Sequence, residues 1–324
     1  MLTLLQKNKK IIVNTDIDGV LSAFVLCKFC GCEIVGFSNS DDRVWWRKDK
    51  IGSIYDGVYI DMYVPRKDVV TIDQHIIAYD EEELHTIASF GTKINPNLEN
   101  PRTFTPGESY KYKYPFGTVH YLLAILGAAG ITVQFDLNRL VDLPESNRLC
   151  IGDFVLRADD AAKTTLCSNY RSNALQWWQW LEHKSAVSTN IRDLVTYLQG
   201  CSRKEEDVES RKKDIAKFFR ARYGCRKSDG GFKSPCDING FVLDATKKYM
   251  MDFWSILGAN PKDLQDVLTA KYECACGKAY RCWIKPDEAQ ELKTSCSIGG
   301  QQVFSYGYVN SPRSPRQNFS YTVM

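Results

Sequence analysis

The sequence has no long hydrophobic run and no strong excess of charge of one sign. Its longest apolar stretch, Tyr121–Val133, is too short to cross a bilayer and predicts a buried helix instead. The N-terminal segment lacks the apolar core and small-residue cleavage site of a signal peptide. The formal net charge of +3 is close to neutral for 324 residues and does not indicate a nucleic-acid or membrane partner by itself. We therefore expect a soluble cytoplasmic protein with no membrane association.

Cysteine, by contrast, is abundant, with 12 residues in the chain. Disulfide frameworks are typical of short secreted proteins, so in a chain of this length we expect reduced thiols. One group could hold Zn²⁺ through four thiolates, and its members are Cys274, Cys276, Cys282 and Cys296. Structural zinc sites more often use a two-residue spacer than the single Ala275 found here. Buried or inert thiols are the favoured interpretation, with zinc as the alternative.

Length and composition predict two globular domains. The chain has 44% hydrophobic and 25% charged residues, and 324 residues exceed one ordinary hydrophobic core. Strand-like and helical segments alternate in the first part, which indicates an α/β fold with a mainly parallel sheet. We predict this domain over residues 1–200, a helical connector over 201–228, and a smaller α+β domain over 229–324. The Ser-, Pro- and Arg-rich residues from Ser311 onward are expected to form a mobile tail.

Hydrophobic periodicity locates the main elements. The predicted strands cover residues 11–13, 33–37, 55–60, 68–72, 240–243 and 281–284, and the predicted helices cover 19–29, 117–126 and most of 161–222. Three tryptophans, Trp177, Trp178 and Trp180, lie close together in the last helical region. They could stack on bases, but burial in a core or interface is the favoured interpretation.

Acidic side chains follow several of the predicted strands. They are Asp16 and Asp18 after residues 11–13, Asp61 after 58–60, Asp73 and His75 after 69–72, and Asp153 after 149–151. The carboxyl ends of parallel strands meet at one edge of a sheet, which would bring these side chains together. Each Asp could alternatively cap a helix, and His75 could be a packed histidine.

Carboxylates that lie close together need a cation to neutralise their repulsion. Oxygen ligands suit Mg²⁺ or Mn²⁺, and such ions can activate water in a phosphoryl displacement. We predict that Asp16, Asp18, Asp61 and Asp153 hold the metal and its attacking water. Asp73 would be a ligand or an orienting group, and His75 would neutralise phosphate charge. The sequence therefore predicts a divalent-metal phosphoesterase.

These motifs resemble those of the DHH phosphoesterases. The matching segments, in chain order, are Asn14-Thr15-Asp16-Ile17-Asp18-Gly19 with Ser22-Ala23, Tyr59-Ile60-Asp61, Asp73-Gln74-His75, Lys93-Ile94-Asn95-Pro96, and Gly152-Asp153. Asp159 and Asp160 are competing positions for the last motif. The resemblance covers roughly residues 10–160. Two positions depart from the family pattern, because Asn14 and Gln74 stand where the family has metal-binding histidines. The site could therefore hold one ion rather than two, or favour Mg²⁺.

The resemblance implies hydrolysis of phosphodiester or phosphoanhydride bonds with Mn²⁺ or Mg²⁺. The implied substrates are nucleotides, oligonucleotides or single-stranded nucleic acid, and a homo-oligomer is compatible with the sequence. Asp18, Asp73 and His75 would be catalytic, and Asn14 and His75 would contact substrate. The family's second domain grips substrate through a Gly-rich loop, which the segment containing Gly299 and Gly300 resembles. A hairpin turn is the alternative for that segment.

Two other functions remain open. Asp16-Ile17-Asp18-Gly19 also resembles the first motif of haloacid-dehalogenase-type phosphatases, in which Asp16 would be a covalent nucleophile. That alternative leaves Asp61 and His75 without a role. The second possibility is a catalytically degenerate nucleotide- or nucleic-acid-binding subunit, which Asn14 and Gln74 would explain.

Overall fold

The computed structural model describes residues 10–104, 109–145, 168–186, 204–225, 231–308 and 317–324. The chain forms two compact units, and each is assembled from separate stretches of sequence. Unit 1 includes Thr15–Ile34 and Pro115–Tyr272, and unit 2 comprises Lys10–Asn14, Val35–Tyr114 and Glu273–Met324. The domains predicted above are consecutive segments, whereas the chain leaves and re-enters each of these units.

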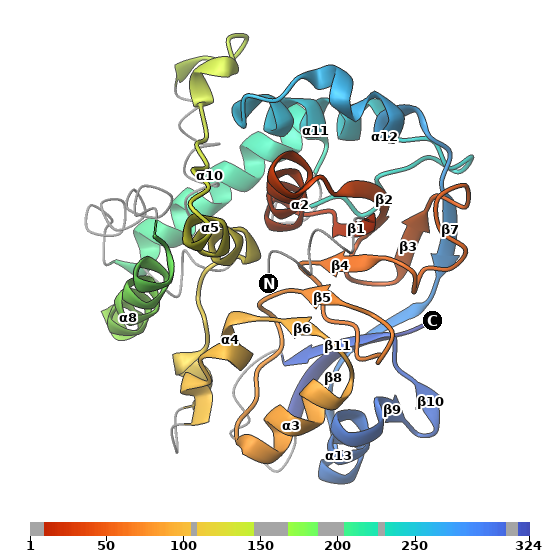
Figure 1. Cartoon of the computed structure of the whole chain (residues 1–324). Helices are drawn as coiled ribbons and strands as arrows, with labels where there is room; N and C mark the ends of the chain where they lie inside the picture. The colour runs from red at the N-terminus through yellow and green to blue at the C-terminus, as the bar shows by residue number, and fades with distance from the viewer. Residues whose placement is uncertain (1–9, 105–108, 146–167, 187–203, 226–230, 309–316) are drawn as a thin grey trace. The chain divides into compact units, whose positions relative to one another are not determined.

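Unit 2 is built on a seven-stranded sheet with the strand order β6-β5-β4-β1-β2-β3-β7 (Figure 1). The strands are β1 (Lys10–Asn14), β2 (Glu33–Ser38), β3 (Arg43–Trp46), β4 (Val58–Ile60), β5 (Thr71–Ile72), β6 (Lys93–Ile94) and β7 (Glu273–Cys276). The pairs β1–β4, β4–β5 and β5–β6 are parallel, and β2–β3 and β3–β7 are antiparallel. The α/β fold with a mostly parallel sheet is confirmed.

Strands β1, β2, β4 and β5 occur where the apolar runs predict them. Strands β3, β6 and β7 were not predicted, since they have two to four residues and lack a long apolar run. Each of these short segments is paired with a neighbouring strand of the sheet. Gly36 of β2 shows how closely these strands approach, because a Cβ there would lie 2.5 Å from the Trp45 carbonyl oxygen.

The rest of unit 2 contains a small antiparallel sheet with the order β11-β12-β8. Its strands are β8 (Lys278–Ile284), β11 (Ser305–Tyr308) and β12 (Gln317–Val323), and the hairpin strands are β9 (Ser297–Ile298) and β10 (Gln301–Gln302). The helices of unit 2 are α3 (Glu81–Ser89), α4 (Pro96–Glu99) and α13 (Pro286–Ser295), with 3-10 turns η1 (Arg102–Phe104) and η2 (Ser109–Tyr112). The predicted strand at residues 281–284 is therefore part of β8.

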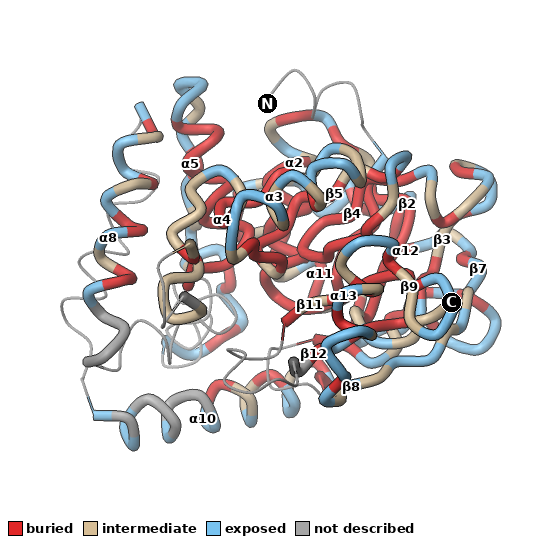
Figure 2. Tube along the Cα trace, turned by 90° about the horizontal axis from the view of Figure 1, so that it is seen from below, coloured by how far each residue is buried: buried red, intermediate tan, exposed pale blue. Residues whose placement is uncertain are grey.

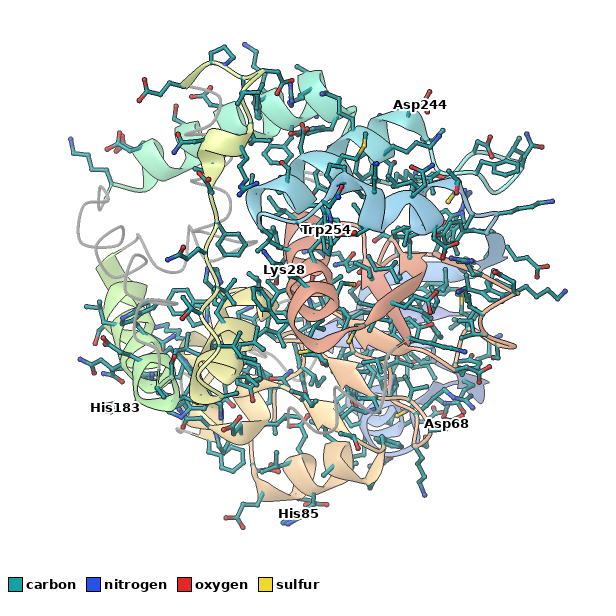
Figure 3. The ribbon with its side chains drawn as sticks, turned by 45° about the horizontal axis from the view of Figure 1, so that its top comes forward. Lys28, Asp68, His85, His183, Asp244 and Trp254 are labelled. Carbon is teal, nitrogen blue, oxygen red and sulfur yellow. The ribbon has the colours of Figure 1, made fainter. Side chains whose placement is uncertain are left out.

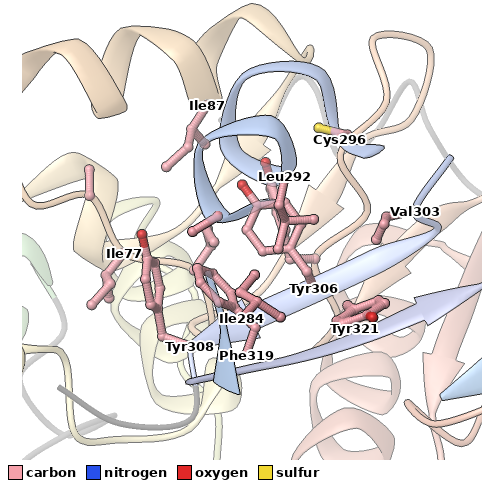
Figure 4. Packing of buried hydrophobic residues seen from close by; sticks show 14 residues of the cluster. Ile77, Ile87, Ile284, Leu292, Cys296, Val303, Tyr306, Tyr308, Phe319 and Tyr321 are labelled. Atoms are coloured by element: carbon pink, nitrogen blue, oxygen red, sulfur yellow. The ribbon is translucent and has the colours of Figure 1, made fainter. Parts of the chain in front are cut away.

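The predicted mobile tail is wrong for residues 317–323, because β12 is the central strand of the small sheet. Phe319 and Tyr321 alternate with polar residues, and both are buried in a hydrophobic cluster with Ile284, Leu292 and Tyr308 (Figure 4). The period-two alternation is a strand signal. The Ser-, Pro- and Arg-rich composition of the preceding segment concealed that signal.

Unit 1 is mainly helical. Its helices are α2 (Ile17–Cys30), α5 (Thr118–Ala128), α8 (Ser168–Lys184), α10 (Glu205–Tyr223), α11 (Asp244–Ile256) and α12 (Gln265–Thr269), with 3-10 turns η3 (Leu137–Arg139) and η4 (Pro261–Leu264). Helix α2 is buried along most of its length and packs against α5 and α11 (Figure 2). The rings of Phe24 and Trp254 meet edge to face, with their centroids 5.0 Å apart. No helix among the described residues is long and apolar enough to span a membrane.

Most helical predictions for this unit hold where the chain is described. Trp177 and Trp178 are buried in α8, as the favoured interpretation requires, and Trp180 stacks on Tyr121. The predicted strand at residues 240–243 is wrong, because this segment forms only isolated bridges through Phe241 and Val242. The Gly240 N–H donates to the Asp237 carbonyl and closes a tight turn, which leaves few residues here for strand pairing.

Candidate functional site

Four neighbouring parallel strands of unit 2 end in polar residues. Asn14 is the last residue of β1, while Asp61, Asp73 and Asn95 directly follow β4, β5 and β6. The strands are adjacent in the order β6-β5-β4-β1, so their carboxyl ends form one continuous edge. All four residues are buried, and none of them is more than 3% exposed. Ligand sites of open α/β sheets occupy this edge, so the cluster is the candidate site.

Asp61 is the centre of the cluster. Its Oδ2 atom accepts a hydrogen bond from Asn14 Nδ2 at 2.9 Å, and its Oδ1 atom lies 3.0 Å from His75 Nε2. Its backbone is left-handed, with a φ of 60°. That conformation is uncommon outside glycine, although Asp and Asn tolerate it best. A buried, left-handed residue held by two partners is the kind of local strain that concentrates at functional positions.

Asp73 uses its two carboxylate oxygens very differently. Its Oδ1 atom accepts hydrogen bonds from the His75 N–H at 2.8 Å, the Ile76 N–H at 3.3 Å and Asn95 Nδ2 at 3.1 Å. Its Oδ2 atom is buried and has no hydrogen-bond partner. Burial raises the pKa of Asp73 and outweighs the lowering effect of His75 and of the backbone hydrogen bonds, while the Asp61 carboxylate raises this pKa slightly further. A buried carboxylate oxygen in this setting is stabilised by a proton or by a cation.

Two asparagines fix the loop that carries His75. Asn95 Nδ2 also donates to the Ile76 carbonyl at 3.1 Å, and Asn97 Nδ2 donates to the Gln74 carbonyl at 2.9 Å. The Asn97 Oδ1 atom accepts the Tyr114 N–H at 2.6 Å. Sequence reasoning noted the Asn-Pro stretch but assigned no role to either asparagine. The available signal was a pair of amides flanking a proline directly after a strand.

His75 is the accessible member of the cluster. Its side chain is 36% exposed, whereas the Asp61 side chain is fully buried. Gln74 Nε2 lies 3.4 Å from His75 Nδ1, so the glutamine amide can donate to this nitrogen. That arrangement fits the tautomer in which Nε2 carries the proton toward Asp61. The imidazole therefore joins the buried carboxylates to solvent.

The donor set fits a hard cation that keeps several water ligands. Burial raises the pKa of Asp73, and its Oδ2 atom has no hydrogen-bond partner. Mg²⁺ typically binds one or two protein carboxylates and retains water, whereas a closed site needs more protein ligands. Among the described residues, no group of three or more His, Cys, Asp or Glu side chains could hold a metal ion.

Asp16 and Asp18 belong to unit 1 and have local structural partners there. Asp16 is the N-cap of α2, and its Oδ1 atom accepts the Gly19 N–H at 2.9 Å. Both oxygens of Asp18 accept backbone N–H groups from the start of α5, at 2.7 Å from Thr118 and 2.9 Å from Val119. These contacts were not predicted, because they link residues about one hundred positions apart. Asp153, Asp159 and Asp160 lie outside the described residues.

The contacts of Asp18 predict a measurable loss of stability. Replacing Asp18 with Ala removes two charge-assisted hydrogen bonds at the α5 N-terminus, so we expect the free energy of unfolding to fall by about 2 kcal/mol. Urea unfolding followed by circular dichroism measures this change. Asp80→Ala is a matched control, because Asp80 caps α3 through a single bond and is exposed. Equal stabilities for Asp18→Ala and wild type would refute the capping role.

The glycine turn and the four cysteines named in the sequence analysis all lie among the described residues. Gly299 and Gly300 connect β9 and β10, which confirms the hairpin alternative. Their N–H groups both donate to the Glu291 carboxylate at 3.1 Å, so a substrate there would have to displace Glu291. Cys296 is buried in the hydrophobic cluster of the small sheet. All four predicted zinc ligands are described, and no group of three or more His, Cys, Asp or Glu side chains among the described residues could hold a metal ion.

A hollow of about 490 Å³ lies elsewhere, within unit 1. Lys28, Trp254 and Asn260 line it, and Figure 3 labels the first two of these side chains. None of the predicted site residues contributes to its wall. Glu33, Asp263 and Asp266 also line it, but none of them is buried, whereas Asp61 and Asp73 are, so the strand-end cluster is the stronger candidate.

The chain matches no protein-family model, no curated protein and no solved structure. The resemblance to DHH phosphoesterases thus rests on the motifs alone.

Proposed function

We propose that the protein is a divalent-metal-dependent phosphoesterase that hydrolyses a phosphodiester in a nucleotide, an oligonucleotide or single-stranded nucleic acid. The observation that carries the proposal is the buried, partnerless Oδ2 atom of Asp73 beside the Asp61 carboxylate and the accessible His75 imidazole. The order of the motifs, which resembles that of DHH phosphoesterases, adds support. The substrate class comes from this resemblance.

Asp61 and Asp73 would hold the cation in this proposal. The other ligands predicted from the sequence are not used in it: Asp16 and Asp18 contact helix ends of unit 1, and Asp153 lies outside the described residues. A bound Mg²⁺ or Mn²⁺ would supply a water activated near neutral pH and would stabilise charge on the phosphoryl oxygens. His75 would lie at the accessible edge of the cluster and would neutralise the charge of a bound phosphate. Asn95 and Asn97 hold the loop so that the imidazole keeps this position.

Hydrolysis by the full-length chain tests the proposal. Purified protein should cleave bis-(p-nitrophenyl) phosphate or a short single-stranded oligonucleotide when Mg²⁺ or Mn²⁺ is present, and a chelator should stop the reaction. His75→Ala should lower the rate about 100-fold, because the substituted protein lacks the imidazole that would neutralise phosphate charge. The position is partly exposed, so the variant should retain the wild-type fold.

His85→Ala is the matched control for this variant. His85 lies on α3 with an exposed side chain, and Figure 3 shows it at the periphery of the molecule. It should leave the rate unchanged. If His75→Ala and His85→Ala hydrolyse substrate equally well, the assigned role of His75 is wrong. If the wild-type protein binds nucleotides in Mg²⁺ without hydrolysing any of these substrates, the degenerate binding subunit replaces the enzyme.

A further inference from the structure

Strand β7 carries two cysteines on one face at the border of the seven-stranded sheet. It pairs with β3 and is the last strand in the sheet order, so no described strand covers its other edge. Residues two apart in a strand point to the same side, which places Cys274 and Cys276 together and Ala275 opposite. Ala275 packs against a hydrophobic cluster that contains Val44, its partner on β3. The two thiols are consequently turned away from that cluster, and both residues are exposed.

The separation of the two sulfur atoms matches a shared metal ion. The Sγ atoms of Cys274 and Cys276 lie 3.9 Å apart. Two thiolates on a tetrahedral Zn²⁺, with bonds of about 2.3 Å, are about 3.8 Å from one another. A cation could therefore enter between the sulfurs with little movement of the strand. Their positions are fixed by backbone pairing, because Cys274 is paired with Trp45 and Cys276 with Arg43.

We propose that Cys274 and Cys276 form a two-thiolate site for a thiophilic divalent cation of the Zn²⁺ or Cd²⁺ type, with water completing the coordination. The two thiols release their protons to solvent as two metal–sulfur bonds form. This site differs from the four-cysteine arrangement predicted from the sequence. Cys296 is excluded from it by burial in the hydrophobic cluster, and Cys282 belongs to the small sheet as the partner of Phe319.

The exposure of the two thiols and their small number indicate an exchangeable metal site rather than a structural one. A structural zinc site uses four protein ligands and excludes water, whereas a pair of exposed thiolates leaves positions open. Soft thiolate ligands discriminate strongly against Mg²⁺. The site therefore binds exchangeable zinc-like ions separately from the carboxylate cluster, where a hard cation is expected. Loss of the thiol pair should leave the hydrolysis proposed above unchanged.

Cadmium titration of the reduced full-length protein tests the proposal. Cd²⁺ bound to thiolate absorbs in the ultraviolet, so the wild type should show a saturable signal at one ion per chain that Zn²⁺ displaces. Cys274→Ser and Cys276→Ser should each weaken binding by at least about tenfold, because one ligand is lost. Cys282→Ser is the matched control, and its titration should equal that of the wild type.

A second measurement uses the wild type alone and does not depend on the folding of a variant. Zn²⁺ should protect Cys274 and Cys276 together against alkylation by iodoacetamide, as read by peptide mass spectrometry, while Mg²⁺ should not. The proposal is overturned if the wild type gives no saturable cadmium signal. It is equally overturned if both serine variants bind Cd²⁺ as the wild type does, or if Zn²⁺ leaves the alkylation of both cysteines unchanged.

Discussion

Asp61→Asn should reduce metal-dependent phosphodiester hydrolysis to the rate of the metal ion alone, a loss of about 1000-fold for an active enzyme. The amide keeps the size of the carboxylate but removes its charge, so a cation loses its central ligand. Asn is the sharpest substitution here because it tolerates the left-handed backbone of Asp61, with its φ of 60°. Ala at this position would add about 1–2 kcal/mol of backbone strain and confuse the comparison.

Two readouts separate a metal ligand from a structural residue. Isothermal titration calorimetry should show Mg²⁺ or Mn²⁺ affinity reduced by at least about tenfold in Asp61→Asn, while circular dichroism remains unchanged. Asp68→Asn is the matched control, because the Asp68 side chain is 60% exposed and pairs only with Arg66 among the ion pairs of the described residues (Figure 3). Full activity in Asp61→Asn would refute the proposed metal site at Asp61. If Asp16→Asn were inactive at the same time, the haloacid-dehalogenase alternative would be favoured.

Phe319→Ala should destabilise the protein by about 3–5 kcal/mol, the cost of emptying a large buried aromatic site. Phe319 is fully buried in the central strand of the small sheet. Its ring lies 4.7 Å from that of Tyr308 and 6.1 Å from that of Tyr306, centroid to centroid (Figure 4). Urea unfolding followed by circular dichroism measures the change in free energy.

Trp283→Ala is the control for this substitution. Trp283 belongs to β8 in the same sheet, but its side chain is 49% exposed, so its loss should cost less than about 1 kcal/mol. A truncation that ends at residue 316 removes β12 entirely and should prevent the small sheet from forming. Wild-type stability in either Phe319→Ala or the truncated chain would show that the last strand lies outside the core.

The sequence predicted the parallel half of the large sheet because its signals are local. Residues 11–13 and 58–60 are continuous apolar runs on two parallel strands, and polar residues follow where the strands end. Such runs are buried on both faces of a parallel sheet, so the pattern and the structure have the same cause. Asp61, Asp73 and His75 could be assembled from that inference alone, since parallel strands bring their carboxyl ends to one edge.

Long-range contacts decided what local patterns could not. The partners of Asp18 at the start of α5 are about one hundred residues away, and β7 joins β3 from the other end of the chain. The sulfur pair at Cys274 and Cys276 depends on this strand pairing, which the sequence around the cysteines does not specify. Short strands of this kind are stabilised by hydrogen bonds to a neighbour rather than by their own propensity.

The predicted metal site depends on both local sequence signals and long-range contacts. From its own residues, the sequence determined that acidic groups end successive strands, because strand ends and charges are local features. Only the tertiary structure decided how those groups are partnered: Asn14 donates to Asp61, His75 reaches the same carboxylate, and Asp73 retains one buried oxygen without a donor. The physical reason is that a carboxylate's hydrogen bonds and pKa depend on neighbours that folding brings together from distant parts of the chain.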